Sequence, residues 1–119
     1  MNPLTVYHYP ACGTCRNAIK WLKAHDKELE LVHIVDAPPP RDVLASLIAK
    51  SGLDVRKFFN TSGEVYKSLK LKDQLPSMSE DEQIDLLASN GKLIKRPIVT
   101  DGEQVTVGFK EDMFAQAWG

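Results

Sequence analysis

The chain has 119 residues, of which 43% are hydrophobic and 26% are charged, and its formal net charge is −1. These values are ordinary for one compact domain, and the near-zero charge excludes a general attraction to nucleic acid or anionic membranes. Because no apolar run approaches the ~20 residues that span a bilayer, we expect no membrane span. The N-terminus leads directly into a predicted strand, without a charged segment followed by an apolar one, so we also expect no signal peptide. We therefore expect a single cytoplasmic domain over residues 1–119, in a compartment where thiols are kept reduced.

The first predicted element is a strand over residues 4–9, which is rich in β-forming residues. Pro10 ends this strand, and the only two cysteines of the chain, Cys12 and Cys15, follow it. A helical pattern then covers residues 17–24, with apolar side chains on one face. A Cys-x-x-Cys pair at a strand-to-helix turn is typical of a thioredoxin-like redox site.

The position of Cys12 favours a reactive thiol. It directly precedes the first helical turn, where free backbone N–H groups and the helix dipole stabilise an anion. This environment lowers the pKa of a thiol and populates the thiolate, which is the attacking form. Cys15 lies one turn further on, within reach to close a disulfide. Arg16 adds a nearby positive charge, and His8 would add another if it were protonated.

Three other interpretations of the cysteine pair are open. A zinc site requires about four ligands, but there is no second Cys pair, and His25 and His33 lie at unrelated spacings. We therefore expect no metal. A structural disulfide across two residues would close a very small loop and constrain little. An inert buried pair is the third alternative, and redox or nucleophilic chemistry is the interpretation that the turn favours.

The next elements continue a βαβα order. Alternating apolar residues predict a second strand over residues 29–35, in which His33 is expected to face solvent or to be hydrogen-bonded. Three consecutive prolines then lead to a helix over residues 41–50, which Gly52 ends. The crossover between the first two strands is long enough to make them parallel.

Residues 53–91 show no clear strand, and we interpret them as a helical insertion. Ser79 and Glu82 form a capping-box pattern ahead of a helix that Asn90 and Gly91 end. The segment has fewer than forty residues and no β pattern of its own, so we expect an insertion and not a second domain.

The C-terminal third returns to strands. A strand over residues 98–100, a turn at Asp101-Gly102 and a return strand over residues 105–109 form a predicted hairpin, and a last helix covers residues 111–118. The order of elements predicts an α/β, thioredoxin-like fold: a four-stranded mixed sheet with flanking helices and a helical insertion.

Three motifs resemble the arsenate reductase (ArsC) family, which also contains the Spx and MgsR-type regulators. They are His-Tyr-Pro-Ala-Cys-Gly-Thr-Cys-Arg-Asn at residues 8–17, Asn-Thr-Ser-Gly at residues 60–63, and Leu-Ile-Lys-Arg-Pro-Ile-Val at residues 93–99 followed by Val-Gly-Phe at 107–109. The resemblance covers nearly the whole chain and implies a thioredoxin-like fold with a helical insertion.

The resemblance also implies roles for individual residues. In the reductases, a Cys at the position of Cys12 attacks arsenate, a His matching His8 helps to lower its pKa, and three Arg hold the oxyanion. Arg96 matches one of these, whereas Asn60 and Phe109 stand in place of the other two. Each charge-assisted contact contributes about 1.5–3 kcal/mol, so the sequence predicts weak arsenate binding.

The remaining residues implied at the site are Arg96 and Pro97. In thioredoxin-like folds the matching Pro is cis and lies across from the nucleophile, where it presents a backbone edge to a thiol-bearing partner. Arg96 could instead cap the sheet or pair with an acid. Together with Arg16 and Asn60, these two are the candidate substrate- or oxyanion-binding residues.

Two functions follow from the resemblance. The first is a thiol-disulfide oxidoreductase without a bound cofactor, in which Cys12 attacks, Cys15 resolves, and glutathione, glutaredoxin or thioredoxin re-reduces the pair. The second is an Spx-like redox-sensing regulator that binds the RNA polymerase α subunit. A scaffold with vestigial chemistry is a third. We favour the oxidoreductase, because neither the net charge nor the C-terminal sequence indicates a transcription partner.

Overall fold

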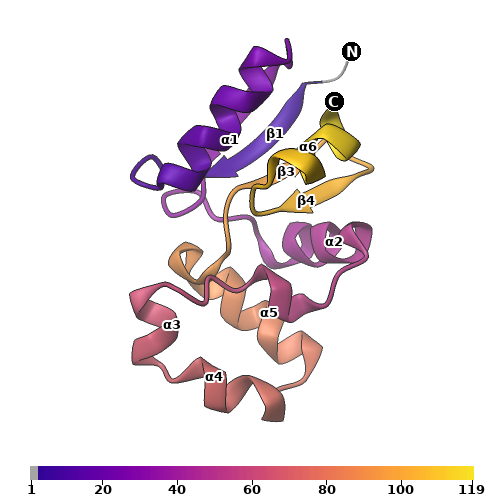
Figure 1. Ribbon diagram of the computed structural model, residues 1–119. Coiled ribbons are helices and arrows are strands. Elements are labelled where there is room, and N and C mark those ends of the chain that lie inside the picture. The colour runs from indigo at the N-terminus through magenta and orange to yellow at the C-terminus, as the bar shows by residue number, and fades with distance from the viewer. Residues whose placement is uncertain (1–2) are drawn as a thin grey trace.

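The structure is a computed structural model that describes residues 3–119. A four-stranded sheet forms its upper half in Figure 1, with strand order β2-β1-β3-β4. Strands β1 and β2 are parallel, whereas β3 is antiparallel to β1 and β4 is antiparallel to β3. The strands are β1 (Leu4–His8), β2 (Leu29–His33), β3 (Ile98–Thr100) and β4 (Val105–Val107). The predicted α/β architecture with a mixed sheet is therefore confirmed.

Helices account for most of the rest of the described chain. The α-helices are α1 (Gly13–Ala24), α2 (Arg41–Ser51), α3 (Glu64–Ser68), α4 (Leu71–Gln74), α5 (Glu80–Ser89) and α6 (Glu111–Trp118). Short 3-10 turns are η1 (Val55–Phe58), η2 (Leu75–Ser77) and η3 (Gly91–Leu93). Within residues 3–119, no helix is both long and apolar enough to cross a membrane.

Three predicted strands are too long. The first ends at His8, one residue before the predicted end. The second ends at His33 and not at residue 35, because the ring Nδ1 of His33 accepts from the backbone N–H groups of Val35 and Asp36 and bends the chain. The return strand ends at Val107 because Gly108 adopts a φ of 80°. The first helix, in turn, begins at Gly13, earlier than the pattern over residues 17–24 indicates.

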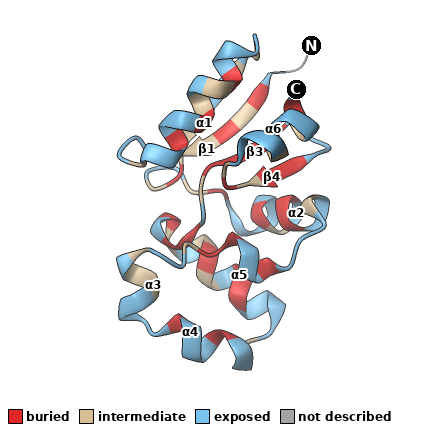
Figure 2. Cartoon of the chain, in the orientation of Figure 1, coloured by how far each residue is buried: buried red, intermediate tan, exposed pale blue. Residues whose placement is uncertain are grey.

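A separate cluster of buried apolar side chains packs on each face of the sheet. Figure 2 shows the buried residues in red. Val6 and Val99 pack against α1 and α6 on one face. Ile98 and Val105 pack against α2 and the insertion on the other. The alternation of side chains along each strand sends neighbouring residues to opposite clusters, so both faces are buried.

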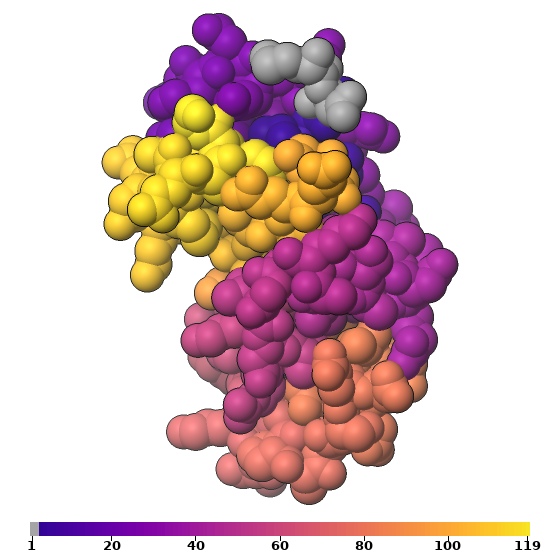
Figure 3. Space-filling view, turned by 90° about the vertical axis from the view of Figure 1, so that its right-hand side faces the viewer, coloured from indigo at the N-terminus to yellow at the C-terminus, as the bar shows by residue number. Residues whose placement is uncertain are grey.

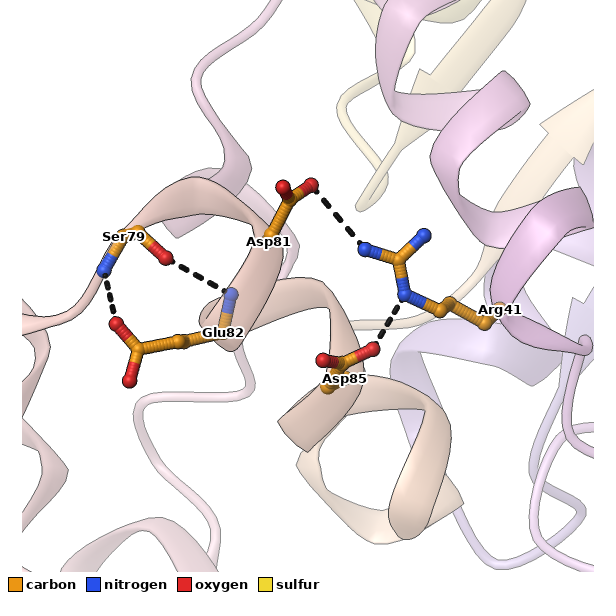
Figure 4. Close-up of polar contacts among 5 residues, drawn as sticks. All are labelled: Arg41, Ser79, Asp81, Glu82 and Asp85. Atoms are coloured by element: carbon orange, nitrogen blue, oxygen red, sulfur yellow. Dashed lines mark hydrogen bonds and ion pairs between the residues drawn. The ribbon is translucent and has the colours of Figure 1, made fainter.

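The insertion extends the molecule away from the sheet, giving overall dimensions of 42 × 26 × 26 Å. The predicted capping box is present: Ser79 Oγ accepts from the N–H of Glu82 at 3.2 Å, and the Glu82 carboxylate accepts from the N–H of Ser79 at 3.0 Å. Arg41 of α2 bonds to Asp81, at 3.1 Å, and to Asp85 (Figure 4). These ion pairs join α2 to α5.

Backbone contacts between the insertion and the segment before β3 prepare the site. The N–H of Asn60 donates to the carbonyl of Leu93 at 2.7 Å, and the N–H of Lys95 donates to the carbonyl of Phe58 at 2.7 Å. These two bonds hold the turn after η1 beside the chain that leads into Arg96. The start of the insertion and the entry to β3 are thereby fixed together.

Candidate active site

Cys12 is the N-cap residue of α1, as its place in the sequence predicts. Its backbone is extended, and its Sγ accepts from the N–H of Cys15 at 3.4 Å. The carbonyl of Cys12 accepts from the N–H of Arg16 at 3.1 Å, which starts the helical hydrogen bonds. The sulfur therefore replaces the capping oxygen usual at this position, and it receives an otherwise free helical N–H group.

The pKa of Cys12 is lowered by its surroundings. Partial burial of the thiol raises the pKa, but hydrogen bonding from Cys15 and the nearby positive charge of Arg96 outweigh that effect. The net direction favours the thiolate, which is the nucleophilic form of a cysteine. Cys12 is half-buried, so an incoming substrate can reach the sulfur.

Arg96 is held against the ring of Tyr9. Its guanidinium carbon lies 4.9 Å from the ring centroid, within the range of a cation–π contact. The Nη1 atom of Arg96 is buried and has no hydrogen-bond partner among the described residues. No acidic side chain within residues 3–119 pairs with this arginine either. The guanidinium charge is therefore free to act on the Cys12 thiolate.

The peptide bond between Arg96 and Pro97 is cis, as expected from the thioredoxin-like pattern. Pro97 is buried, and its carbonyl accepts from the N–H of Gly108 at 2.9 Å. This bond ties the cis segment to the end of β4. Pro97 therefore fixes the backbone beside Arg96, but among the described residues it is not one that lines the groove at Cys12.

Cys15 differs sharply from Cys12. Its side chain is fully buried, and both thiols are free. Burial, together with the neighbouring Cys12, raises the pKa of Cys15 to about 12, although a backbone hydrogen bond from Tyr9 acts in the opposite direction. The buried thiol is therefore protonated at neutral pH, while the outer sulfur is the one poised to attack.

His8 does not provide a positive charge to the site at neutral pH. Its pKa is lowered by burial and by the charge of His33, whose ring centroid lies 6.2 Å away. The two residues are paired across β1 and β2, which explains their proximity. Cys12 therefore owes its lowered pKa to Cys15 and Arg96 and not to a protonated His8.

Cys12 opens into a groove of about 640 Å³ between the amino-terminal turn, the insertion and the C-terminal segment. Thr14, Asn60, Arg96 and Phe109 also line it. Phe109 packs edge-on against Phe114, with ring centroids 4.7 Å apart. The structure thus brings Cys12, Asn60 and Arg96 together. Arg16, an exposed residue of α1, does not line the groove, and neither does His8.

Sequence reasoning missed three lysines of the groove. Lys57, Lys95 and Lys110 all line it, and no aspartate or glutamate of the described residues does. Each lies within three residues of Asn60, Arg96 or Phe109, so the signal available was the cationic flanks of the motif residues. Among the described residues, no three His, Cys, Asp or Glu side chains gather as a metal site would require.

The profile of the ArsC family matches residues 7–117. The uncharacterized protein YusI of Bacillus subtilis is 61% identical over 97% of this chain and 98% of its own length. The arsenate reductase of Escherichia coli K12 is 37% identical, over 83% of this chain and 69% of that enzyme. The global transcriptional regulator Spx of Streptococcus pyogenes is 31% identical, over 92% of this chain and 80% of the regulator.

Solved structures show the same architecture. The crystal structure of an ArsC family related protein from Bacteroides fragilis superposes with a TM-score of 0.92 at 50% identity, covering 95% of each chain. An arsenate reductase from Vibrio cholerae superposes with a TM-score of 0.85 at 27% identity, covering 97% of each chain.

Proposed function

The chain belongs to the ArsC family, and on that premise we propose that it is a thiol-disulfide oxidoreductase. The observation that supports this proposal most is the asymmetry of its two thiols. Cys12 is accessible and has a lowered pKa, whereas Cys15 is buried and protonated one helical turn away. An accessible thiol with a lowered pKa is suited to attack first, and a second thiol one helical turn away is placed to resolve the mixed disulfide.

The proposed reaction has two exchange steps. The Cys12 thiolate attacks one sulfur of a substrate disulfide, forms a bond to it, and releases the other sulfur as a thiolate. Cys15 then loses its proton and its sulfur attacks Cys12, which forms the internal disulfide, breaks the mixed disulfide between Cys12 and the substrate, and releases the second substrate sulfur, which takes up that proton. The substrate gains two electrons and the cysteine pair loses two. A thiol reductant such as glutathione, glutaredoxin or thioredoxin returns the pair to its reduced form.

The groove suits a disulfide better than arsenate. Among residues 3–119, Arg96 is the one arginine that lines it. Asn60 and Phe109 also line it, at the two positions where the resemblance to the reductases implies further arginines. The ring of Phe109 is engaged with Phe114. A tetrahedral dianion therefore lacks convergent guanidinium donors, whereas disulfide exchange needs only an activated sulfur and space beside it.

Single-turnover reaction with 2,2′-dithiodipyridine tests the proposal, because this disulfide is small and uncharged. The reduced protein should release two equivalents of thiopyridone and form the Cys12–Cys15 disulfide. Cys15→Ser should release one equivalent and retain a mixed disulfide on Cys12. Cys12→Ser should react slower by on the order of a thousandfold, because its one remaining thiol is buried and protonated. Equal rates for Cys12→Ser and Cys15→Ser would sink the proposal.

The similarity to Spx supports a second candidate, a redox-sensing regulator that binds RNA polymerase. The same cysteine pair would then act as a switch instead of turning over. A pull-down with the C-terminal domain of the polymerase α subunit, run on the reduced and the oxidised protein, separates the two functions. Redox-dependent binding at micromolar concentration favours the regulator, and its absence together with turnover favours the oxidoreductase.

A further inference from the structure

The groove beside Cys12 is electropositive although the chain as a whole is not. Lys57, Lys95, Arg96 and Lys110 line it without any acidic side chain, whereas the net charge of the chain is −1. Figure 3 shows an indentation in the silhouette between the yellow C-terminal segment and the insertion, two segments that border the groove. A cleft lined by charge of one sign concentrates the opposite charge within it.

The three lysines carry no ion pair among residues 3–119. Lys95 extends across Gly108, where its Cε lies 3.2 Å from the place a Cβ would occupy. Gly108 thus leaves the space in which the lysine side chain lies within the groove. These ammonium groups are available to a ligand and are not committed to the protein's own carboxylates.

The positive surface continues beyond the groove. Lys57 and Lys95 also line a neighbouring pocket of about 390 Å³, together with Arg56. The one acid of that pocket, Asp54, is already paired with Arg56 at 3.2 Å. An extended ligand bound to Cys12 would therefore lie beside further cationic side chains at increasing distance from the sulfur.

The arrangement suits an extended ligand and not a compact one. The cations come from three separate segments: Lys57 from η1, Lys95 and Arg96 from the chain before β3, and Lys110 from the residue before α6. Apolar side chains also line the groove. Those apolar residues are Leu53, Val107, Phe109 and Met113. Spaced charges with apolar surface between them match a peptide that carries carboxylates at intervals along its chain.

We infer that the groove takes, as the disulfide substrate, a cysteine-bearing peptide segment in which acidic residues flank the cysteine. The inference rests on the proposed function and names the substrate class of the same site. The cysteine of the segment would exchange with Cys12, and the flanking carboxylates would lie against Lys57, Lys95 and Lys110.

Two synthetic peptides test this inference. They share one sequence with a central cysteine blocked as the 2-pyridyl disulfide, and they differ only in flanking Asp/Glu or flanking Lys. Thiopyridone release from the reduced protein gives the rate for each. The acidic peptide should react about tenfold faster at low ionic strength, which is the lower end of electrostatic steering. The ratio should approach one in 1 M salt, where the Debye length is only ~3 Å.

Charge-reversal variants test whether the groove lysines cause the preference for the acidic peptide. In K57E/K95E the ratio of acidic to basic rates should fall by about tenfold, because both lysines line the groove and its neighbouring pocket. K67E/K72E is the matched control: it changes the net charge equally, and neither residue lines either pocket. The control should keep the wild-type ratio. The ratio within each variant is the readout, so changes in intrinsic thiol reactivity cancel.

The outcomes that overturn the inference differ from those that overturn the proposed function. Equal rates for the two peptides, or an equal loss of preference in both double variants, exclude an acidic peptide. A faster reaction with glutathione disulfide than with the acidic peptide would assign the groove to a small thiol instead. Failure to react with the uncharged 2,2′-dithiodipyridine would remove the oxidoreductase itself.

Discussion

The amino-terminal turn (residues 8–17) and the insertion (residues 53–91) both line the groove at Cys12, but they contribute different things. The turn supplies the reacting sulfur, the helical N–H group that stabilises it, and the resolving thiol, all within four residues. The insertion supplies Lys57 and Asn60 from a turn that backbone hydrogen bonds fasten to the entry of β3. The reacting sulfur and the resolving thiol therefore come from one local turn, to which a distant segment adds the charge of Arg96. Most of the surface that meets a substrate depends on the packing of distant segments.

Replacing Arg96, a distant residue that acts on the sulfur of the turn, should weaken the chemistry most strongly. Arg96→Met removes the charge that lowers the pKa of Cys12, so that pKa should rise. The exchange rate should fall roughly ten- to a hundredfold at pH 7, as expected from losing a charge-assisted contact of about 1.5–3 kcal/mol. The rate with 2,2′-dithiodipyridine measured against pH checks this.

The direction of the pH dependence follows from the thiolate. The rate rises as pH increases through the pKa of Cys12 and is level above it, so Arg96→Met should move the curve to higher pH. The variant should regain most of its rate in alkaline buffer. Arg96→Lys, which retains the charge, should lie between the two. A uniform loss at every pH would contradict an electrostatic role for Arg96.

Gly91→Ala should break the contact between the insertion and the sheet. A Cβ at this residue would overlap the backbone carbonyl of Ile34, at the end of β2. Because backbone must move to relieve the overlap, we expect a loss of about 1–3 kcal/mol in the free energy of unfolding. Urea denaturation measures it. Gly13→Ala is the control, since a Cβ there meets nothing within 4 Å, and it should leave stability unchanged or slightly higher.

Tyr9→Leu should have the smallest effect of these substitutions, and it tests how the turn holds the distant Arg96. The substitution removes the aromatic face that holds the Arg96 guanidinium. A cation–π contact contributes ~0.5–1 kcal/mol at such a site, so the exchange rate at pH 7 should fall about two- to fivefold. Tyr9→Phe keeps the ring and should retain the wild-type rate. A loss in Tyr9→Phe as large as in Tyr9→Leu would point to the hydroxyl instead.

Much of the reacting part of the site was predictable from the sequence. The cysteine spacing and the strand-to-helix turn identified Cys12 as the N-cap, and Arg96 followed from its motif. Arg16 was predicted at the site because it follows Cys15 in the chain, but it is exposed on α1 and does not line the groove. Proximity in sequence does not fix where a helical side chain lies. The pKa of His8 is lowered mainly by burial and further by His33, and only the fold shows that burial and the strand register that brings His33 near.

The fold was predictable in its order of elements and less so in its extents. Alternation and turn residues identified all four strands, but hydrogen bonds made by the His33 ring and the positive φ of Gly108 shortened two of them. The stacking of Arg96 on Tyr9 joins residues 87 positions apart in the chain, so no local pattern could reveal it.

The rate of alkylation of Cys12 measured against pH tests the central claim most directly. The measurement is best made on Cys15→Ser, in which Cys12 is the only thiol, and checked on the wild-type protein by mass spectrometry of the modified cysteine. The account predicts that Cys12 titrates clearly below the ~8.5 of a free thiol. A titration at or above that value would show that the amino end of α1 and Arg96 do not activate the sulfur.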